Sequence, residues 1–264
     1  MVSSIGCGGG GDDAKVTGYQ IVAEQGSSLT AVAGDAVQLK VVETLDDGNT
    51  RDVPGDTKVT WTAPPTITSL APDDTTSASP MPAPGADPTG FFLNNPTRGD
   101  AAADLRGTLF VLDAGASGAG SIAVSATVPG QAAPITASVV VGPTPAGDAT
   151  KGKTTYRNNC AICHGQTGDG SPPNPDGSYT IDGLKSDFPA PGLNNAPGAG
   201  FVGGDPDWNA AVLAVAARAD ADDGAVALRL PMPSWLTEPS IEHGKPLTTQ
   251  DFADIYAYLV SETQ

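Results

Sequence analysis

The strongest restriction on the fold of this chain is the pentapeptide Cys160-Ala161-Ile162-Cys163-His164. Two thiols three positions apart can each add to one vinyl group of a single porphyrin, and the adjacent imidazole can then bind the iron. The chain contains only 3 Cys and 2 His, and three of these five residues fall in this segment. The spacing therefore predicts one covalently bound haem c, with thioether bonds at Cys160 and Cys163 and His164 as the proximal iron ligand.

Two other chemistries use paired cysteines. A structural zinc site needs a second pair of ligands, and only Cys7 and His243 remain, far apart in the sequence. A thioredoxin-like redox dithiol is expected beside a βαβ pattern, and none is visible around Cys160. Both patterns fit the sequence less well than haem attachment.

Three helices are expected in the second half of the chain. Residues 151–163 place Gly152, Tyr156 and Cys160 at four-residue steps on one face. Residues 208–218 are rich in Ala, Val and Leu and follow Asp205-Pro206-Asp207, a typical helix start. Residues 248–262 begin with threonines that can cap a helix and continue with a clear apolar stripe. The residues of this stripe are Phe252, Ile255, Tyr256, Leu259 and Val260.

Residues from about 148 to 264 resemble a class I, single-haem cytochrome c. Gly152 and Tyr156 match the glycine and the aromatic residue of the N-terminal helix of that family, and Ile255 and Tyr258 match positions of its C-terminal helix. The resemblance implies an all-α cytochrome c fold in which these two helices cross, with the glycine allowing their backbones to touch. It also implies that Tyr156 is among the haem-binding residues.

Three further segments carry the resemblance. The sequence after His164 continues with Gly165 and Gly168-Asp169-Gly170, similar to the Gly-rich continuation of the family. Pro191-Gly192-Leu193 resembles the Pro-x-Leu segment, which implies that the Pro191 carbonyl binds the proximal histidine and that Leu193 packs on the haem; Pro189-Ala190 is an alternative. Leu230-Pro231-Met232-Pro233 resembles the loop that supplies the axial sulfur.

Met232 is also the best sixth ligand on independent grounds. Thioether sulfur is a soft neutral donor that suits haem iron, and flanking prolines stiffen the loop around it. Of the 3 Met in the chain, Met1 is terminal and Met81 lies in a Ser/Ala/Pro-rich stretch. The rival ligand is His243, in a polar stretch typical of a surface loop. Trp235, in the same loop as Met232, is a further haem-binding candidate.

The first half of the chain has a different character, with alternating apolar runs bounded by Gly, Pro, Asp or Asn. These runs cover residues 18–24, 36–42, 57–62, 107–112, 121–128 and 134–141. Such a pattern predicts an all-β sandwich, with Asp46-Asp47-Gly48-Asn49 as a turn and Trp61 as a core aromatic between two sheets. Ala33-Gly34-Asp35 before a strand, the Asp-Gly turn and Val59-Thr60-Trp61 resemble a bacterial immunoglobulin-like domain. The resemblance implies a spacer or docking module.

A two-domain organisation follows from the 264-residue length and from this shift in composition. Residues 1–14 are expected to form a tether, and residues 15–142 the immunoglobulin-like sandwich with an insertion near 70–104. Residues 143–149 are rich in Pro and Gly, which is typical of a linker. Residues 150–264 then form the cytochrome c domain.

The net charge of −17 argues against nucleic acid as a partner. Redox partner proteins are the partners that a cytochrome implies, and covalent haem attachment implies a periplasmic or cell-surface location. Ser4-Ile5-Gly6-Cys7, followed by glycines, resembles the end of a bacterial lipoprotein signal, although the family prefers Leu where Ser4 stands. This resemblance implies a lipid on Cys7 that tethers the chain to a membrane.

The sequence is therefore interpreted as that of an extracytoplasmic electron carrier and not an enzyme. Two alternatives stay open. The chain could be the electron-accepting subunit or domain of a larger oxidoreductase, or a cell-surface binding protein whose haem is auxiliary.

Overall fold

The computed structural model describes most of the strand-rich region and the helices that surround the pentapeptide. The described residues are 14–24, 28–54, 57–62, 66–67, 90–93, 106–112, 120–170, 179–181, 184–186, 193, 209–219 and 244–262. Cys7, Pro191, Met232, Trp235 and His243 lie outside these ranges. So does most of the predicted insertion at 70–104.

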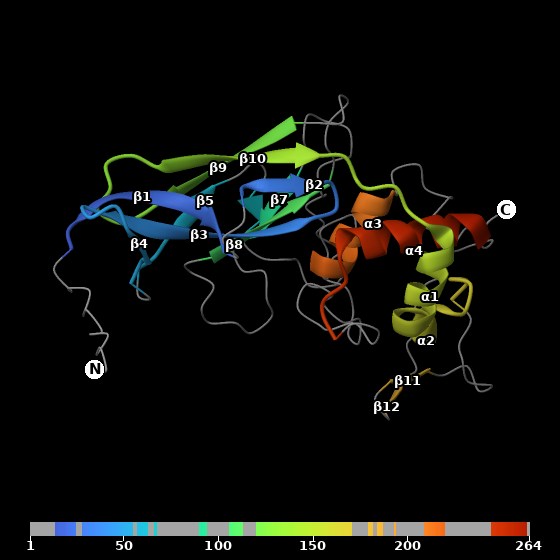
Figure 1. The fold of residues 1–264 in the computed structure, drawn as a ribbon. Coiled ribbons are helices and arrows are strands. Elements are labelled where there is room, and N and C mark those ends of the chain that lie inside the picture. The colour runs from blue at the N-terminus through green and yellow to red at the C-terminus, as the bar shows by residue number, and fades with distance from the viewer. Residues whose placement is uncertain are drawn as a thin grey trace, which may run out of the picture.

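The described strands of the first half form two sheets (Figure 1). The first has the order β1-β3-β8-β7-β6, with β4 paired to β3, and the second has the order β2-β10-β9-β5. The strands of the first sheet are β1 (Val16–Ala23), β3 (Ala36–Leu45), β4 (Thr50–Asp52), β6 (Thr66–Ile67), β7 (Gly90–Leu93) and β8 (Arg106–Val111). Those of the second are β2 (Thr30–Val32), β5 (Thr60–Thr62), β9 (Gly120–Thr127) and β10 (Ile135–Gly142).

The two sheets share one apolar core, as the alternating pattern predicts. Leu39 of β3, Val111 of β8, Trp61 of β5 and Val139 of β10 all belong to the same cluster of buried side chains. Trp61 is therefore the core aromatic that the sequence predicts. The strand-rich region and its two sheets confirm the predicted all-β class, whereas the immunoglobulin-like identity stays a prediction.

Each of the six predicted runs contains a strand, but four further short strands in the described part of the first half, β2, β4, β6 and β7, were not predicted. β4 illustrates why: all three of its residues are exposed, so its sequence carries no apolar alternation.

The Asp-Gly turn is formed as expected, with Gly48 at φ 83° and Asp47 Oδ1 accepting a hydrogen bond from Asn49 N at 2.9 Å. It connects β3 to β4, which precedes the third predicted run.

The described helices of the second half are α1 (Ala149–Asn159), α2 (Ala161–His164), α3 (Ala210–Ala219) and α4 (Thr249–Glu262), accompanied by the hairpin strands β11 (Tyr179–Ile181) and β12 (Leu184–Ser186). The helix predicted over 151–163 differs in two ways. It begins earlier because the Asp148 side chain accepts hydrogen bonds from Thr150 N and Lys151 N. It is also interrupted at Cys160, so the pentapeptide has its own short helix.

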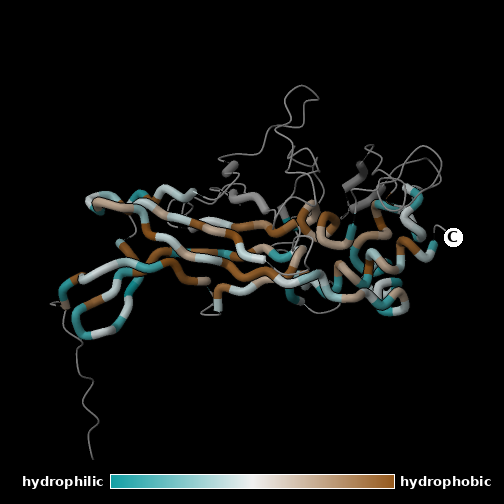
Figure 2. Tube along the Cα trace, turned by 90° about the horizontal axis from the view of Figure 1, so that it is seen from above, coloured by the Kyte–Doolittle hydropathy of each residue, from teal (hydrophilic) through white to brown (hydrophobic). Residues whose placement is uncertain are grey.

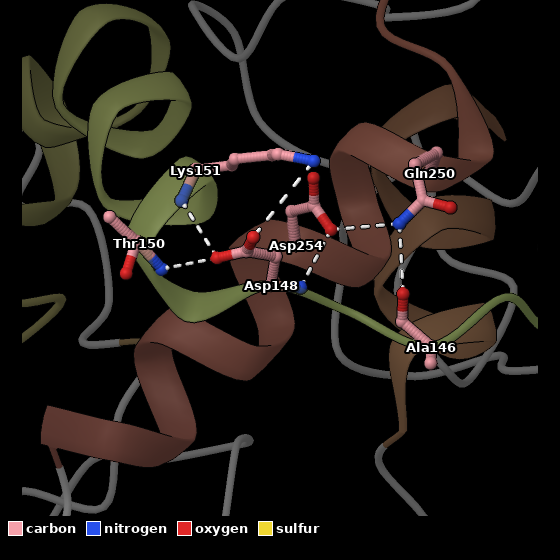
Figure 3. Close-up of polar contacts among 6 residues, drawn as sticks. All are labelled: Ala146, Asp148, Thr150, Lys151, Gln250 and Asp254. Carbon is pink, nitrogen blue, oxygen red and sulfur yellow. Dashed lines mark hydrogen bonds and ion pairs between the residues drawn. The ribbon is translucent and has the colours of Figure 1, made fainter.

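Helices α1 and α4 cross with their backbones in contact, as the resemblance implies. A Cβ atom added to Gly152 would lie 1.8 Å from the carbonyl oxygen of Asp254, and one added to Gly147 would lie 2.0 Å from that of Ala253. Figure 3 shows the polar contacts beside this crossing, where the Asp254 carboxylate accepts hydrogen bonds from Asp148 N and from the Gln250 side chain, both at 2.8 Å. The Gln250 amide also donates to Ala146 O at 2.9 Å, so the chain entering α1 is fixed to α4.

The helices pack against one end of the two sheets (Figures 1 and 2). In the register of the first sheet, Ala36 pairs with Phe110, while Leu45 pairs with Val16 at the opposite end. Phe110 and the following Leu112 join the apolar cluster of α1, α3 and α4. Among the described residues, no helix is long and apolar enough to cross a membrane.

Candidate haem-binding site

The pentapeptide forms a single helical turn at the end of α1. Cys160 N donates to Tyr156 O at 2.7 Å, and the Cys160 carbonyl accepts hydrogen bonds from Cys163 N at 3.2 Å and from His164 N at 3.0 Å. Residues three and four positions apart share one face of such a turn. Cys160, Cys163 and His164 are therefore presented on one side of the chain.

Burial differs along this turn. His164 is only 7 % exposed, Cys160 and Cys163 are partly exposed, and Ile162 is 49 % exposed. His164 thus lies against the protein interior together with Ala161, whereas Ile162, the other residue between the two cysteines, faces solvent. One side of the turn is fixed by packing and the other is accessible.

The thiols are not activated as they would be in a redox dithiol. Burial, with a contribution from Cys163, raises the pKa of Cys160 to about 12, and burial also raises the pKa of Cys163. Reactive dithiols instead have lowered pKa values, because the thiolate is the nucleophile. Among the described residues, no group of three or more His, Cys, Asp and Glu side chains could hold a metal ion. The described residues therefore support neither a redox dithiol nor a structural zinc site.

A glycine-rich loop follows His164 and closes on it. Gly165, Gly168 and Gly170 have φ values of 81°, 79° and 74°, which residues with a side chain rarely adopt. Gly170 N donates to the His164 carbonyl at 2.9 Å, and Leu193 N donates to Gly168 O at 2.6 Å. The loop therefore returns to His164 and is held by a residue of the predicted Pro-x-Leu segment.

Two tyrosine hydroxyls hold the same loop from different helices. Tyr156 of α1 donates to the Gly165 carbonyl, and Tyr258 of α4 donates to the Gln166 carbonyl, both at 2.9 Å. The two rings lie 5.5 Å apart. Burial raises the pKa of each phenol above its ordinary value, so both act as neutral donors at physiological pH.

The structure brings together five of the eight predicted site residues: Tyr156, Cys160, Cys163, His164 and Leu193. Leu193 packs against the helical core, while Pro191, Met232 and Trp235 lie outside the described residues. The contacts of all eight with haem stay predictions. Sequence reasoning used Tyr258 only as a helix-crossing residue and missed its hydrogen bond to Gln166, because the two residues are 92 positions apart.

The donor set fits haem c. Two thiols on one helical turn match the two vinyl groups of a single porphyrin, and the adjacent His164 is buried, with its backbone fixed by hydrogen bonds on both sides. These features define the class of the second half as a helical haem-binding domain.

Comparison with known families agrees with this class. Residues 149–263 match the Cytochrome c family. The chain thus contains a cytochrome c domain, preceded by the strand-rich region. Such a domain implies covalently bound haem c and haem-based electron transfer, with redox proteins as partners. No curated protein shows significant sequence similarity to the chain.

The two tyrosine contacts predict a measurable difference in stability. In Tyr156→Phe the buried Gly165 would lose the hydrogen bond to its carbonyl, which costs about 1 to 3 kcal/mol of unfolding free energy. In Tyr258→Phe the carbonyl belongs to exposed Gln166 and can bind water, so we expect a loss of about 0.5 to 1.5 kcal/mol. Denaturant titration of both variants checks the order, and a larger loss for Tyr258→Phe would contradict this account of the loop.

Proposed function

We propose that the chain is an extracytoplasmic electron carrier with one haem c, attached at Cys160 and Cys163 and bound at the iron by His164 and Met232. The observation that supports it most is the single helical turn on which both thiols and the buried imidazole share a face. The cytochrome c match over residues 149–263 agrees with this chemistry.

Each part of the described site has a role in such a carrier. Haem supplies a one-electron ferric/ferrous couple when it is bound. The hydrogen bond from Gly170 N to the His164 carbonyl fixes the backbone that carries the imidazole, and the two tyrosines restrain the loop between these residues. A proximal ligand held in one position limits the rearrangement that accompanies a change in iron charge.

The exposed side of the turn suits exchange with a partner. Ile162, between the two cysteines, is a large apolar side chain at the surface. A redox protein that docks over Ile162 would reach the attachment turn without any opening of the fold.

Covalent attachment is the first test. Haem should remain with the protein through acid-acetone extraction and denaturing electrophoresis, because thioether bonds survive both treatments. The double variant Cys160→Ala, Cys163→Ala should lose haem under the same conditions, while Ile162→Ala serves as the matched control within the turn and should retain it. Release of haem from the unmutated protein would contradict the proposed site.

The sixth ligand is the second test, since it separates a carrier from an enzyme with an open iron site. Met232→Ala should remove the near-infrared sulfur-to-iron band, lower the reduction potential and let carbon monoxide reach the iron. Met232→His should remain six-coordinate and also have a lower potential, because nitrogen stabilises ferric iron relative to a thioether. A wild-type spectrum in Met232→Ala, together with an altered one in His243→Ala, would assign the ligand to His243.

The proposed membrane anchor rests on Cys7. The Ser4-Ile5-Gly6-Cys7 segment resembles a lipidation site, and one lipidated cysteine would tether the chain to a bacterial membrane through its Gly-rich start. Expressed with a lipoprotein signal, the protein should partition with membranes, and Cys7→Ser should release it into the soluble fraction. A wild-type protein found wholly in the soluble fraction would refute the anchor without affecting the haem site.

A further inference from the structure

The turn formed by Ala33, Gly34 and Asp35 ties the two sheets together at the end nearest the helices. Ala33 N donates to the Gly142 carbonyl of β10 at 2.9 Å, and Gly34 N donates to the Val111 carbonyl of β8 at 2.7 Å. Since β8 and β10 belong to different sheets, this turn cannot move without disturbing both.

Gly34 in this turn contacts α3 and α4 closely. A Cβ atom added to it would lie 2.9 Å from Thr249 Cγ2 and 3.3 Å from both Ala211 Cα and Ala214 Cβ. Its φ of 101° is also one that residues with a side chain rarely adopt. The small residues of α3 and the glycine of the turn together allow this approach.

Arg218, in the last turn of α3, connects all three elements. Its Nη1 donates to the Gly34 carbonyl and, at 2.9 Å, to Thr249 Oγ1, while its Nη2 donates to Leu247 O at 2.9 Å. The Thr249 hydroxyl also donates to the Asp35 carboxylate. Arg218 is 7 % exposed, and a buried guanidinium is tolerated only where its donors are satisfied.

The charge of Arg218 is balanced from both sides of the contact. Burial lowers the pKa of Arg218 to about 10, while the negative charges of Asp35 and Asp251 act in the opposite direction. The side chain therefore stays charged at neutral pH. One of the two carboxylates belongs to the strand-rich region and the other to α4, so the buried charge depends on both.

The apolar cores also meet at this junction. Phe110, near the end of β8, and Leu112, just after that strand, lie in the cluster formed by α1, α3 and α4. Conversely, Ala211 of α3 lies in the apolar cluster between the two sheets. Figure 2 shows hydrophobic segments of both regions meeting here. The boundary therefore has the character of a protein interior and not of two solvated surfaces.

Tyr156, Ala161 and Cys160 of the attachment site pack in the same apolar cluster as α3 and α4. We propose that the strand-rich region is a structural part of the haem domain, in which Gly34 and Arg218 act as positioning residues that fix α3 against α4 and, through this shared cluster, influence the reduction potential of the haem. The region is then more than a spacer. The redox and haem-absorbance measurements rest on the proposed haem site, whereas circular dichroism and hydrogen exchange report on the junction without it.

The sharpest test compares Gly34→Ala with Gly130→Ala in the full-length holoprotein. Both place a side chain on a residue with positive φ, 101° and 85°, but a Cβ atom at Gly130 would meet nothing within 4 Å. The two variants therefore carry similar backbone strain, and only Gly34→Ala disturbs α3 and α4.

Denaturant unfolding should be followed by haem absorbance and by far-ultraviolet circular dichroism. We expect one coincident transition for the wild type, and a shift of both signals together for Gly130→Ala. In Gly34→Ala the haem signal should be lost at a lower denaturant concentration than the part of the circular dichroism signal that comes from the strands. Separate transitions in the wild type, or a Gly130→Ala shift confined to the circular dichroism signal, would overturn the proposal.

Two measurements under native conditions separate positioning from general stability. Gly34→Ala should lower the reduction potential, because looser packing around a haem admits water and favours ferric iron, whereas Gly130→Ala should keep the wild-type value. Amide hydrogen exchange in α3 and α4 should accelerate in Gly34→Ala but not in Gly130→Ala, and this measurement does not require haem. Equal potentials and equal exchange in the two variants would overturn the proposal.

A second substitution tests the contact itself. Adding Thr249→Ser to Gly34→Ala removes the Cγ2 atom nearest the new methyl group but keeps the hydroxyl that contacts Arg218 and Asp35. We expect partial recovery of potential and exchange, incomplete because Ala211 and Ala214 remain close. No recovery would contradict the contact as described.

Arg218→Lys provides the same readouts if Gly34→Ala does not fold. Lysine keeps the charge but lacks the planar fork that reaches three acceptors. We expect a lower potential and faster exchange in α3 and α4. Wild-type values for both would overturn the role of Arg218.

Discussion

The backbone contact between α1 and α4 at Gly152 is the constraint on which the helical region depends. The Asp254 carbonyl occupies the space that any side chain at position 152 would need, so the two helices approach as closely as their backbones permit. This contact aligns Tyr156 on α1 with Tyr258 on α4. Their hydroxyls can then reach consecutive carbonyls of the loop after His164. A helix crossing therefore determines how the proximal side of the proposed haem site is held.

The strand-rich region supports the same helices from the opposite direction. Its Ala33–Asp35 turn is bonded to both sheets, and Arg218 joins that turn to α3 and to the start of α4. The short segment from Gly142 into α1 is also restrained, because Thr144 Oγ1 donates to the Ala33 carbonyl at 3.0 Å and Gly147 packs on α4. Composition alone describes that segment as a Pro/Gly linker, but its tertiary contacts leave it little freedom.

Prediction from the sequence worked where a short periodic pattern carries the structural information. The six alternating runs each contain a strand, and the Thr248–Glu262 stripe is α4, with Thr248 and Asp251 hydrogen-bonded to each other at its start. It failed where a strand is too short or too polar to alternate, as in β4. It also failed at Cys160, where a turn interrupts an otherwise continuous helical pattern.

The chemistry of the proposed site was determined by the sequence alone, because spacings of three and four residues place Cys160, Cys163 and His164 on one face of any helical turn. The place of Gly152 at the helix crossing could likewise be predicted from the sequence, since this glycine precedes the first cysteine at a helical interval. Only the tertiary structure decided which carbonyl Tyr258 reaches, what Arg218 binds and where Gly34 packs. Those contacts join residues 92, 184 and 215 positions apart. They arise from the packing of sheets on helices, a cooperative outcome that no local pattern encodes.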